Sequence, residues 1–303
     1  MRVLVVANSN RGRFSPFVVE QVEALRRRGV EVEYFGVKGN GMAGYLRNLP
    51  ALRRHIAIFR PDVIHAHYGL SGLLANLQRA VPVVTTYHGS DIHSKGLVLF
   101  LSKLAIRLSQ SNIFVSRKLY EMSAIRRQSY AVIPCGIDTA LFSQQKGEWQ
   151  WGDTMRQVVF AGAFSNAVKN APLAQRAVER LENTRMIELK GFTREEVVKI
   201  LRAADSLIMT SHREGSPQVI KEAVACGCPI VSVDVGDVCD VLKGIPNCFI
   251  ADRDPGDIAE KLQRAASLCH RTDGMETIHS KGLSNDAVAE RILEVYNKVI
   301  EKK

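Results

Sequence analysis

Alternation of β-branched apolar runs with helical patterns is the feature that most constrains the fold of this 303-residue chain. The alternation lapses once, in a polar stretch after Phe142, and then restarts. Apolar runs separated by helices form parallel strands that are buried on both faces of a sheet. We therefore expect two doubly wound α/β domains, with ligands at the carboxyl ends of the strands in a cleft between the domains.

The expected strands are short and spread along both halves of the chain. They cover residues 2–7, 30–37, 62–68, 82–88, 112–116, 130–134, 157–164, 186–192, 205–211, 229–234 and 247–251. The polar stretch SQQKGEWQWGDTM is interpreted as the interdomain linker. The domains are then expected at 1–143 and 144–284, followed by a C-terminal segment, 285–303, that contains an amphipathic helix over 285–300.

Composition excludes several classes of protein. A chain that is 46% hydrophobic and 24% charged is an ordinary globular protein rather than a disordered one. It has no run of about 18 apolar residues that would span a membrane. Its start, MRVLVVA, is interpreted as a first strand rather than a signal peptide. The six cysteines show neither a CxxC nor histidines at zinc spacing, so we expect buried, reduced thiols and a cytoplasmic protein.

Positive charge is concentrated in the first half of the chain. Residues 1–143 contain 19 Lys and Arg against 8 Asp and Glu (net +11), and residues 144–303 contain 22 against 23 (net −1), which together give +10. This asymmetry indicates an anionic partner: nucleic acid, an acidic membrane or a phosphorylated substrate. The basic, apolar segments 46–60 and 95–108 favour a membrane surface, although burial of a helix face in the core also explains each. The sequence shows no basic patch with stacking aromatics, which is the feature that would favour nucleic acid as the partner.

The segment GNGMAG, residues 39–44, has the glycine spacing of a dinucleotide-binding loop. However, it follows the second expected strand rather than the first, and Asp62 begins a strand instead of ending one. We therefore interpret GNGMAG as a flexible loop before a helix over 45–59, and not as an NAD site.

The strongest chemical signal lies in HREGSPQVIKEAVACGCPIV, residues 212–231. Ser216 is a good N-cap and Pro217 a good first residue for a helix that stops at Gly227. The free amides of its first turn are suited to bind phosphate. Glu214 and Glu222 lie on either side and accept hydrogen bonds from pairs of hydroxyl groups, so the stretch fits a sugar nucleotide. The alternative is a solvated Glu222 and a Glu214 that caps a loop.

EGSPQVIKEAVACGCPIVSVDVG resembles the E-x7-E signature of the retaining, nucleotide-sugar-dependent glycosyltransferases of family 4, which have the GT-B fold. Other segments resemble family motifs in the expected order. TYHGSD (86–91) resembles the histidine loop, and VIPCGID (132–138) resembles the P-N-G-V-D turn, with Cys135 in place of Asn. VFAGAF and VKN (within 159–170) resemble the first strand and the basic loop of the donor domain, and LKGF (189–192) resembles the base-contacting loop. The match covers nearly the whole chain. It implies two Rossmann-like domains facing a central cleft, with the last helix crossing back to the N-terminal domain.

The resemblance implies a role for each matching residue. Glu222 would bind the ribose hydroxyls, Glu214 the transferred sugar, and Lys169 the diphosphate, where it offsets charge on the leaving group. His88 would lie at the reacting edge of the sugar with Asp91 nearby; a strand-end histidine bonded to backbone is the alternative. The implied donor-binding residues are Glu222, Gly215, Ser216, Pro217, Gln218, Val219, Gly191, Phe192, Gly162 and Arg213, of which Gly191 and Phe192 border the base.

The chain departs from the family pattern in two loops. Ala163 stands where the family has an arginine, so one phosphate-neutralising cation is missing, and Arg213 or Arg11 is a candidate substitute. The loop NSNRGRFS lacks the paired glycines that the family has after the first strand. Its candidate contacts to the acceptor and the pyrophosphate are Asn10, Arg11 and Gly12.

The implied activity is transfer of a hexose or N-acetylhexosamine from a UDP-sugar to a cell-envelope glycan or lipid-linked acceptor, at the inner face of the membrane. One acid of the pair is expected on the ribose, so the two do not act as a glycosidase acid–base pair. No Asp-x-Asp motif ends a strand, so we expect no metal and no other cofactor. The rival interpretations are a UDP-sugar 2-epimerase of the same fold and a non-catalytic glycan- or nucleotide-binding module, and Ala163 favours the module.

Overall fold

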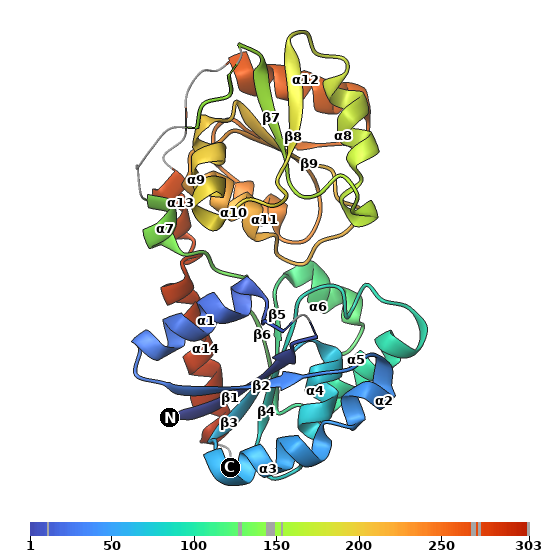
Figure 1. Cartoon of the computed structure of the whole chain (residues 1–303), viewed down its shortest axis with the longest axis vertical. Helices are drawn as coiled ribbons and strands as arrows, with labels where there is room; N and C mark the ends of the chain where they lie inside the picture. The colour runs from blue at the N-terminus through green and yellow to red at the C-terminus, as the bar shows by residue number, and fades with distance from the viewer. Residues whose placement is uncertain are drawn as a thin grey trace. The chain divides into compact units, whose positions relative to one another are not determined.

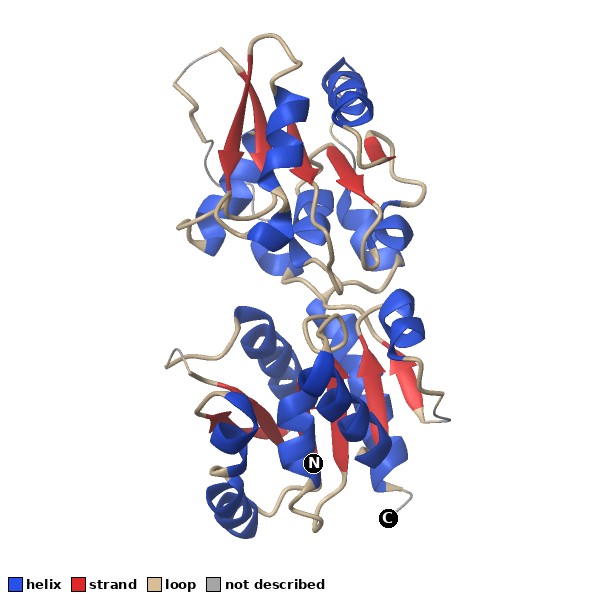
Figure 2. Cartoon of the chain, turned by 90° about the vertical axis from the view of Figure 1, so that its right-hand side faces the viewer, coloured by secondary structure: helices blue, strands red, loops and turns tan. Residues whose placement is uncertain are grey.

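The computed structural model describes residues 1–10, 12–126, 129–143, 149–152, 154–267, 271 and 274–301. The chain divides into two compact units, which we call unit 1 (Met1–Gly136 and Asn285–Lys303) and unit 2 (Ile137–Ser284). Each unit is a parallel sheet with helices on both faces (Figures 1 and 2). The division follows Gly136, whereas the sequence pattern places it after residue 143.

Unit 1 contains a six-stranded sheet in the order β2-β1-β3-β4-β5-β6. Its strands are β1 (Arg2–Asn8), β2 (Glu31–Val37), β3 (Val63–His67), β4 (Val83–Tyr87), β5 (Ser111–Phe114) and β6 (Tyr130–Val132). Its helices are α1 (Pro16–Arg27), α2 (Gly41–Leu46), α3 (Leu49–Phe59), α4 (Gly69–Asn76), α5 (Gly96–Leu108), α6 (Arg117–Ser123) and α14 (Asn285–Ile300). All adjacent strands pair in parallel, as the alternating pattern predicts.

Alternate residues of the first strand pack against helices on opposite faces of the unit 1 sheet. Val3 and Val5 join a core with α1 and α14, and Leu4 and Val6 join a core with α3 and α4. In Figure 1, α1 and α14 lie side by side on one face of the sheet. The predicted apolar positions of the last helix, 288, 292, 295 and 299, are all buried. The final helix therefore completes the N-terminal unit, as predicted.

Unit 2 contains a five-stranded parallel sheet in the order β11-β10-β9-β7-β8. Its strands are β7 (Arg156–Phe160), β8 (Thr184–Glu188), β9 (Ser206–Met209), β10 (Ile230–Val233) and β11 (Cys248–Ala251). Its helices are α7 (Thr139–Ser143), η1 (Ala167–Lys169), α8 (Ala171–Val178), α9 (Arg194–Ala203), α10 (Gln218–Ala225), α11 (Val238–Leu242), α12 (Pro255–Ser267) and α13 (Gly274–Ser280). Val159 faces the core beneath α9 and α10, while Val158 and Phe160 face the core beneath α8 and α12.

The helix predicted over 45–59 is two helices, α2 and α3, and that prediction is wrong. Pro50 has no N–H to donate to the carbonyl of residue 46, so a continuous helix loses a bond there. The Asn48 side chain donates instead to the carbonyls of Gly44 (2.7 Å) and Lys38 (2.8 Å), which fixes the break. The loop interpretation of GNGMAG is also wrong in part, because Gly41 begins α2.

The two tryptophans of the predicted linker pack against the core of unit 2. The Trp151 indole donates to the carbonyl of Ala203 at 3.1 Å, and the Trp149 ring lies 5.6 Å from the ring of Phe192. Residues 144–148 and 153 of that stretch lie outside the described part of the chain.

The five described cysteines form no disulfide with one another, and Cys269 lies outside the described residues. Cys226 and Cys228 are buried as predicted, whereas Cys135, Cys239 and Cys248 are only partly buried. Burial raises the pKa of both Cys226 and Cys228 to about 12, so these thiols stay protonated. None of the described helices is both long enough and apolar enough to span a membrane.

Candidate functional site

The predicted donor residues of unit 2 lie at the carboxyl edge of its sheet. Strands β7 and β9 are neighbours, although the chain runs from β7 to β8 on the other side, so the strand order reverses between β7 and β9. Ligands of doubly wound sheets bind at the carboxyl edge beside such a reversal. The loops after these two strands carry Lys169 and Glu214, which therefore lie where binding is expected.

Lys169 and Glu214 form an ion pair, with 2.7 Å between Nζ and Oε1. Their side chains are 20% and 16% exposed, so the pair is partly desolvated but accessible. A hydrogen bond of 2.8 Å from the amide of His212 to the carbonyl of Val168 ties the two loops together. Gly162 (φ 152°) makes room for the lysine, because a Cβ there would lie 3.0 Å from Lys169 Cγ. The structure thus brings together both unit 2 residues that were predicted to be catalytic.

Glu222 lies in the second turn of α10, and its side chain is only 5% exposed. The alternative of a solvated Glu222 is therefore wrong. Oε1 of Glu222 is in hydrogen-bond contact with the guanidinium of Arg194, the first residue of α9. Arg194 was not predicted from the sequence, because nothing in the local pattern connects the start of α9 to α10.

The start of α10 differs from the prediction. The helix begins at Gln218 with Pro217 as its N-cap, so the assignment of Ser216 as the cap is wrong. The Ser216 hydroxyl instead donates to Oδ2 of Asp237 at 2.6 Å. Pro217, the N-cap residue, makes no side-chain capping hydrogen bond to α10. The amides at the start of a helix are suited to bind an anion.

A buried ion pair supports the loop that carries Glu214. The Lys221 side chain is completely buried, and its Nζ lies 2.9 Å from Oδ2 of Asp237 and donates to the Ser216 hydroxyl. Asp237 follows Gly236 (φ 56°), where a Cβ would lie 2.5 Å from the carbonyl oxygen of Gly215. The loop after β10 therefore fixes the loop after β9. Lys221 and Asp237 were missed; the glycine and acid that end the DVGD segment are the sequence signal for them.

The remaining predicted donor residues surround this group of side chains. Gly191 (φ 83°) turns the chain after β8, and Phe192 packs on Trp149. Gln218 and Val219 are partly exposed at the start of α10, and Arg213 is exposed beside Glu214. After Ala163, the amide of Phe164 donates to Oε2 of Glu188 at 2.6 Å, so an acid holds this loop.

In unit 1, His88 and Asp91 follow β4, where the histidine loop was predicted. Oδ1 of Asp91 accepts hydrogen bonds from the amides of Gly89 (3.0 Å) and Ile92 (3.1 Å). Burial raises the pKa of Asp91 to about 6 despite these hydrogen bonds, which act in the opposite direction. Asp91 therefore fixes the shape of the loop that presents His88.

His88 is the outer member of a stack of three imidazoles, the histidine cluster, completed by His65 and His67 of β3. Ring centroids are 4.5 Å apart for His65 and His67, and 5.2 Å apart for His67 and His88. His67 Nδ1 lies 3.0 Å from His88 Nε2, and His88 Nδ1 lies 3.8 Å from the sulfur of Cys135. Both ring nitrogens of His88 thus face side chains, so the alternative of a backbone-bonded histidine is wrong.

The histidine cluster is neutral at pH 7. Burial lowers the pKa of all three imidazoles, to about 3 for His67. His65 Nδ1 lies 2.5 Å from the hydroxyl of Tyr296, so the cluster is attached to α14. His65 and His67 were not predicted as site residues. Their spacing of two residues in HAH, which puts both on one face of a strand, is the signal that identifies them.

The predicted acceptor loop after β1 is anchored to the loop after β2. The Asn10 side chain donates to the carbonyl of Gly39 and to Asn40 Oδ1, both at 3.0 Å, and accepts from the amide of Gly39 at 2.7 Å. Gly12 has a φ of 72° in the turn that follows. Arg11 lies outside the described residues.

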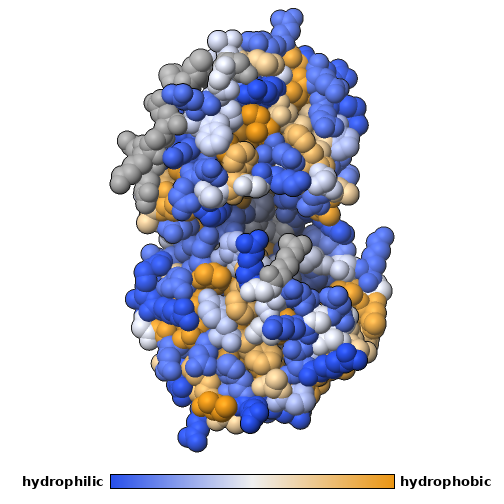
Figure 3. Space-filling view, viewed as in Figure 1, coloured by the Kyte–Doolittle hydropathy of each residue, from blue (hydrophilic) through white to orange (hydrophobic). Residues whose placement is uncertain are grey.

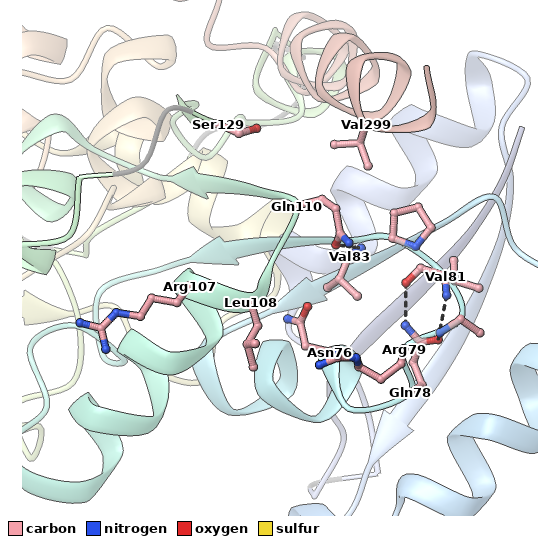
Figure 4. Close-up of a pocket in the computed structure, with 12 residues that line it drawn as sticks. Asn76, Gln78, Arg79, Val81, Val83, Arg107, Leu108, Gln110, Ser129 and Val299 are labelled. Carbon is pink, nitrogen blue, oxygen red and sulfur yellow. Dashed lines mark hydrogen bonds between the residues drawn. The ribbon is translucent and has the colours of Figure 1, made fainter. Parts of the chain in front are cut away.

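A cavity of about 540 Å³ in unit 1 lies at the opposite edge of the sheet, beside the start of β4 (Figure 4). Its glutamine side chains bind backbone groups at the start of β4 and in the loop before it: Gln110 accepts from the amide of Val83 at 2.8 Å, and Gln78 donates to the carbonyl of Val81 at 2.6 Å. None of the predicted site residues lines it. Across the described residues, no three His, Cys, Asp or Glu side chains are grouped to hold a metal ion.

Solved structures of other proteins show which fold this chain has. Sucrose-phosphate synthase from Thermosynechococcus elongatus matches with a TM-score of 0.85 at 15% identity and covers 100% of both chains. Anabaena HepE, solved in complex with UDP and glucose, matches with a TM-score of 0.75 at 14% identity over 98% of this chain and 99% of the other. Two parallel α/β units of this architecture define the GT-B fold.

Two family models match successive parts of the chain: Glycosyltransferase Family 4 at residues 15–141, and Glycosyl transferases group 1 at residues 153–267. D-inositol 3-phosphate glycosyltransferase of Actinosynnema mirum is 25% identical over 94% of this chain and 92% of its own length. The chain therefore belongs to the family 4-like glycosyltransferases of the GT-B fold, as the E-x7-E resemblance implied.

Proposed function

We propose that this glycosyltransferase transfers a hexose or N-acetylhexosamine from a UDP-sugar, with retention of configuration and without a metal ion. The proposed acceptor is an anionic or lipid-linked precursor of a cell-envelope glycan, used in the cytoplasm at the inner face of the membrane.

The observation that carries the proposal is the arrangement of charges around α10. The N-cap residue Pro217 makes no side-chain capping hydrogen bond, Nζ of Lys169 lies 2.7 Å from Oε1 of Glu214 on one side, and Glu222 lies buried on the other. Helix amides and a lysine bind a diphosphate, while two carboxylates each accept hydrogen bonds from hydroxyl groups. This order of groups, acid, anion site and acid, matches the order sugar, diphosphate and ribose in a nucleotide sugar.

Lys169 can serve both neighbours, because an ammonium group has three donors. One donor is used by Glu214, which keeps this carboxylate oriented toward the sugar, and others remain for a phosphate oxygen. In the proposed reaction, the acceptor hydroxyl attacks the anomeric carbon from the side on which the diphosphate leaves. The bond between the anomeric carbon and the phosphate oxygen breaks, and that oxygen takes the hydroxyl proton. Lys169 and the amides of α10 would stabilise the charge of the leaving group.

The compared proteins support the choice of donor and acceptor. HepE is a GT-B protein solved with UDP and glucose, which is the donor chemistry proposed here. The relative from Actinosynnema mirum is named for inositol 3-phosphate, an anionic acceptor. An anionic acceptor would suit the first half of this chain, where residues 1–143 hold a net charge of +11 from 19 basic and 8 acidic residues.

Helix α5 supports the proposed membrane contact. Leu97 and Phe100 are each 59% exposed, and the helix with its flanking Lys95 contains basic residues and no acid. Exposed hydrophobic residues interrupt the hydrophilic surface in Figure 3. Apolar side chains beside Lys and Arg are the features of a surface that docks on anionic lipid.

The test is titration of the chain with UDP by calorimetry, followed by assays of UDP release with candidate UDP-sugars and membrane extracts. We expect UDP binding that Glu222→Ala weakens and that Glu195→Ala, which removes an exposed acid of α9, leaves unchanged. UDP binding without turnover of any donor would favour the non-catalytic module. Conversion of UDP-N-acetylglucosamine to its 2-epimer would identify an epimerase.

A further inference from the structure

Glu222 is a buried acid whose charge needs compensation. Its side chain is 5% exposed, and an ionised carboxylate removed from water is strongly destabilised unless it is paired and hydrogen-bonded. The Arg194 guanidinium in contact with Oε1 supplies a positive charge. The Arg194 side chain is 32% exposed as a whole, but its Nε and Nη2 atoms are buried, so the pair lies largely away from water.

The position of Arg194 is not explained by the stability of its own helix. Arg194 is the first residue of α9, where the helix dipole disfavours a positive charge. The helix start is already complete without it. The Thr193 hydroxyl accepts from the amide of Glu196 at 3.2 Å, and the Glu196 side chain accepts from the amide of Thr193 at 2.7 Å. An arginine at this place therefore serves something outside α9.

The guanidinium of Arg194 is held in place by an aromatic ring. Its guanidinium carbon lies 5.2 Å from the centre of the Phe142 ring, a cation–π contact. Phe142 is completely buried, and its carbonyl accepts a hydrogen bond of 2.8 Å from Arg202. The guanidinium thus rests on a fixed aromatic ring from α7 and is directed at Glu222.

We propose that Arg194 is a positioning residue of the donor site, which holds the Glu222 carboxylate ionised and in the orientation that receives the ribose hydroxyls. This inference rests on the proposed binding of a nucleoside diphosphate. A carboxylate has about four acceptor positions, so a guanidinium at Oε1 and a pair of hydroxyls can use the same group. Arg194 acts through Glu222 and not on the diphosphate.

The test is a double-mutant cycle on the affinity for UDP, measured by calorimetry on the full chain. Arg194→Met keeps the aliphatic stack on Phe142 and removes the charge, and Glu222→Gln keeps the shape of the acid. Because hydrogen bonds to charged groups are among the stronger ones, we expect each single change to weaken UDP about 10-fold or more. The double variant should bind no more weakly than Glu222→Gln alone, since Arg194 acts only through the carboxylate.

Inorganic pyrophosphate separates positioning from general damage to the site. It lacks the ribose, so its affinity should be the same in Arg194→Met as in the unchanged chain. Arg180→Met removes an exposed arginine after α8 and should change neither affinity. Arg194→Lys should retain most of the UDP affinity, and Arg194→Gln should lose it. These two variants provide the test if Arg194→Met does not fold.

The outcomes distinguish the two proposals. If the unchanged chain binds neither UDP nor any other nucleoside diphosphate, the proposed function fails, and the role of Arg194 fails with it. If UDP binds but the effects of the two changes add, or if Arg194→Gln binds UDP as the unchanged chain does, only the role of Arg194 is overturned. An equal loss of pyrophosphate affinity also overturns it.

Discussion

The histidine cluster makes the stability of unit 1 sensitive to acid. Burial lowers the pKa of His67 to about 3, whereas a histidine in the unfolded chain has a pKa of about 6.5. Between these values the unfolded chain binds a proton that the folded chain does not. The free energy of unfolding therefore falls as the pH drops below about 6.5, and this loss continues to about pH 3.

The size of the effect follows from the width of this pH range. Each pH unit within it costs about 1.4 kcal/mol for one histidine, so His67 alone costs about 2 kcal/mol at pH 5. His65 and His88 act in the same direction, since burial also lowers their pKa values. Asp91 opposes them. Its pKa is raised to about 6 by burial, so the folded chain takes up this proton first and gains stability as the pH falls from about 6 to about 4.

The perturbation that isolates one histidine is His67→Gln, which keeps a polar group beside His88 and does not titrate. We expect the slope of the unfolding free energy between pH 6.5 and 5 to decrease by about 1.4 kcal/mol per pH unit. His279→Gln, at an exposed position on α13, should leave the slope unchanged.

The assay is urea unfolding of the whole chain at several pH values, with two probes. Far-UV circular dichroism reports both units, whereas fluorescence reports unit 2, because Trp149 and Trp151 are the two tryptophans of the chain and both lie there. The change in slope should appear in the dichroism and not in the fluorescence if the units unfold separately. An identical pH slope in His67→Gln and the unchanged chain would refute the explanation.

Four further predictions follow from the two units. Glu214→Ala should leave UDP affinity unchanged and abolish sugar transfer, so a UDP-release assay that retains activity would remove Glu214 from the sugar site. EDTA should leave activity intact, and a requirement for added divalent metal would contradict the metal-free reaction. Lys221→Met should destabilise unit 2 by about 3–5 kcal/mol in urea unfolding followed by fluorescence, because it leaves Asp237 buried and unpaired, and adding Asp237→Leu should restore part of the loss. Binding to vesicles should require anionic lipid and weaken with salt. The double variant Leu97→Ser/Phe100→Ser should bind vesicles less, whereas Met122→Ser, a change at an exposed position on α6, should not. Equal binding to neutral vesicles would exclude the basic surface as the cause.

The sheets could be predicted from the sequence because their strands are buried on both faces and therefore appear as continuous apolar runs. The last helix was equally clear, since its apolar positions recur at helical spacing over 285–300. The errors arose where a polar side chain binds a partner that the local sequence does not reveal. Asn48 interrupts a helix by binding three backbone carbonyls, and Ser216 gives its hydroxyl to Asp237 instead of capping α10.

The sequence predicts the site residues that lie within single motif segments, but not the contacts between different loops. Glu214, Glu222 and Lys169 lie in segments with recognisable motifs, and the reversal of strand order brings the loops of Lys169 and Glu214 together. The partners that hold these segments lie in other loops. Asp237 and the histidines of β3 belong to segments that, taken alone, only predict a strand and a turn.

One rule nevertheless predicts that two such partners exist. Lys221 and Glu222 are adjacent in a helix whose other buried residues are apolar, so the helix buries a cation and an anion together. Neighbouring residues in a helix point about 100° apart and do not face one another, so the two charges cannot pair with each other. Each then requires a partner of opposite charge on a different neighbouring segment. The structure supplies Asp237 after β10 for the lysine and Arg194 at the start of α9 for the glutamate. Adjacent opposite charges in a buried helix therefore predict two external partners, and here the two partners fix both sides of the proposed donor site.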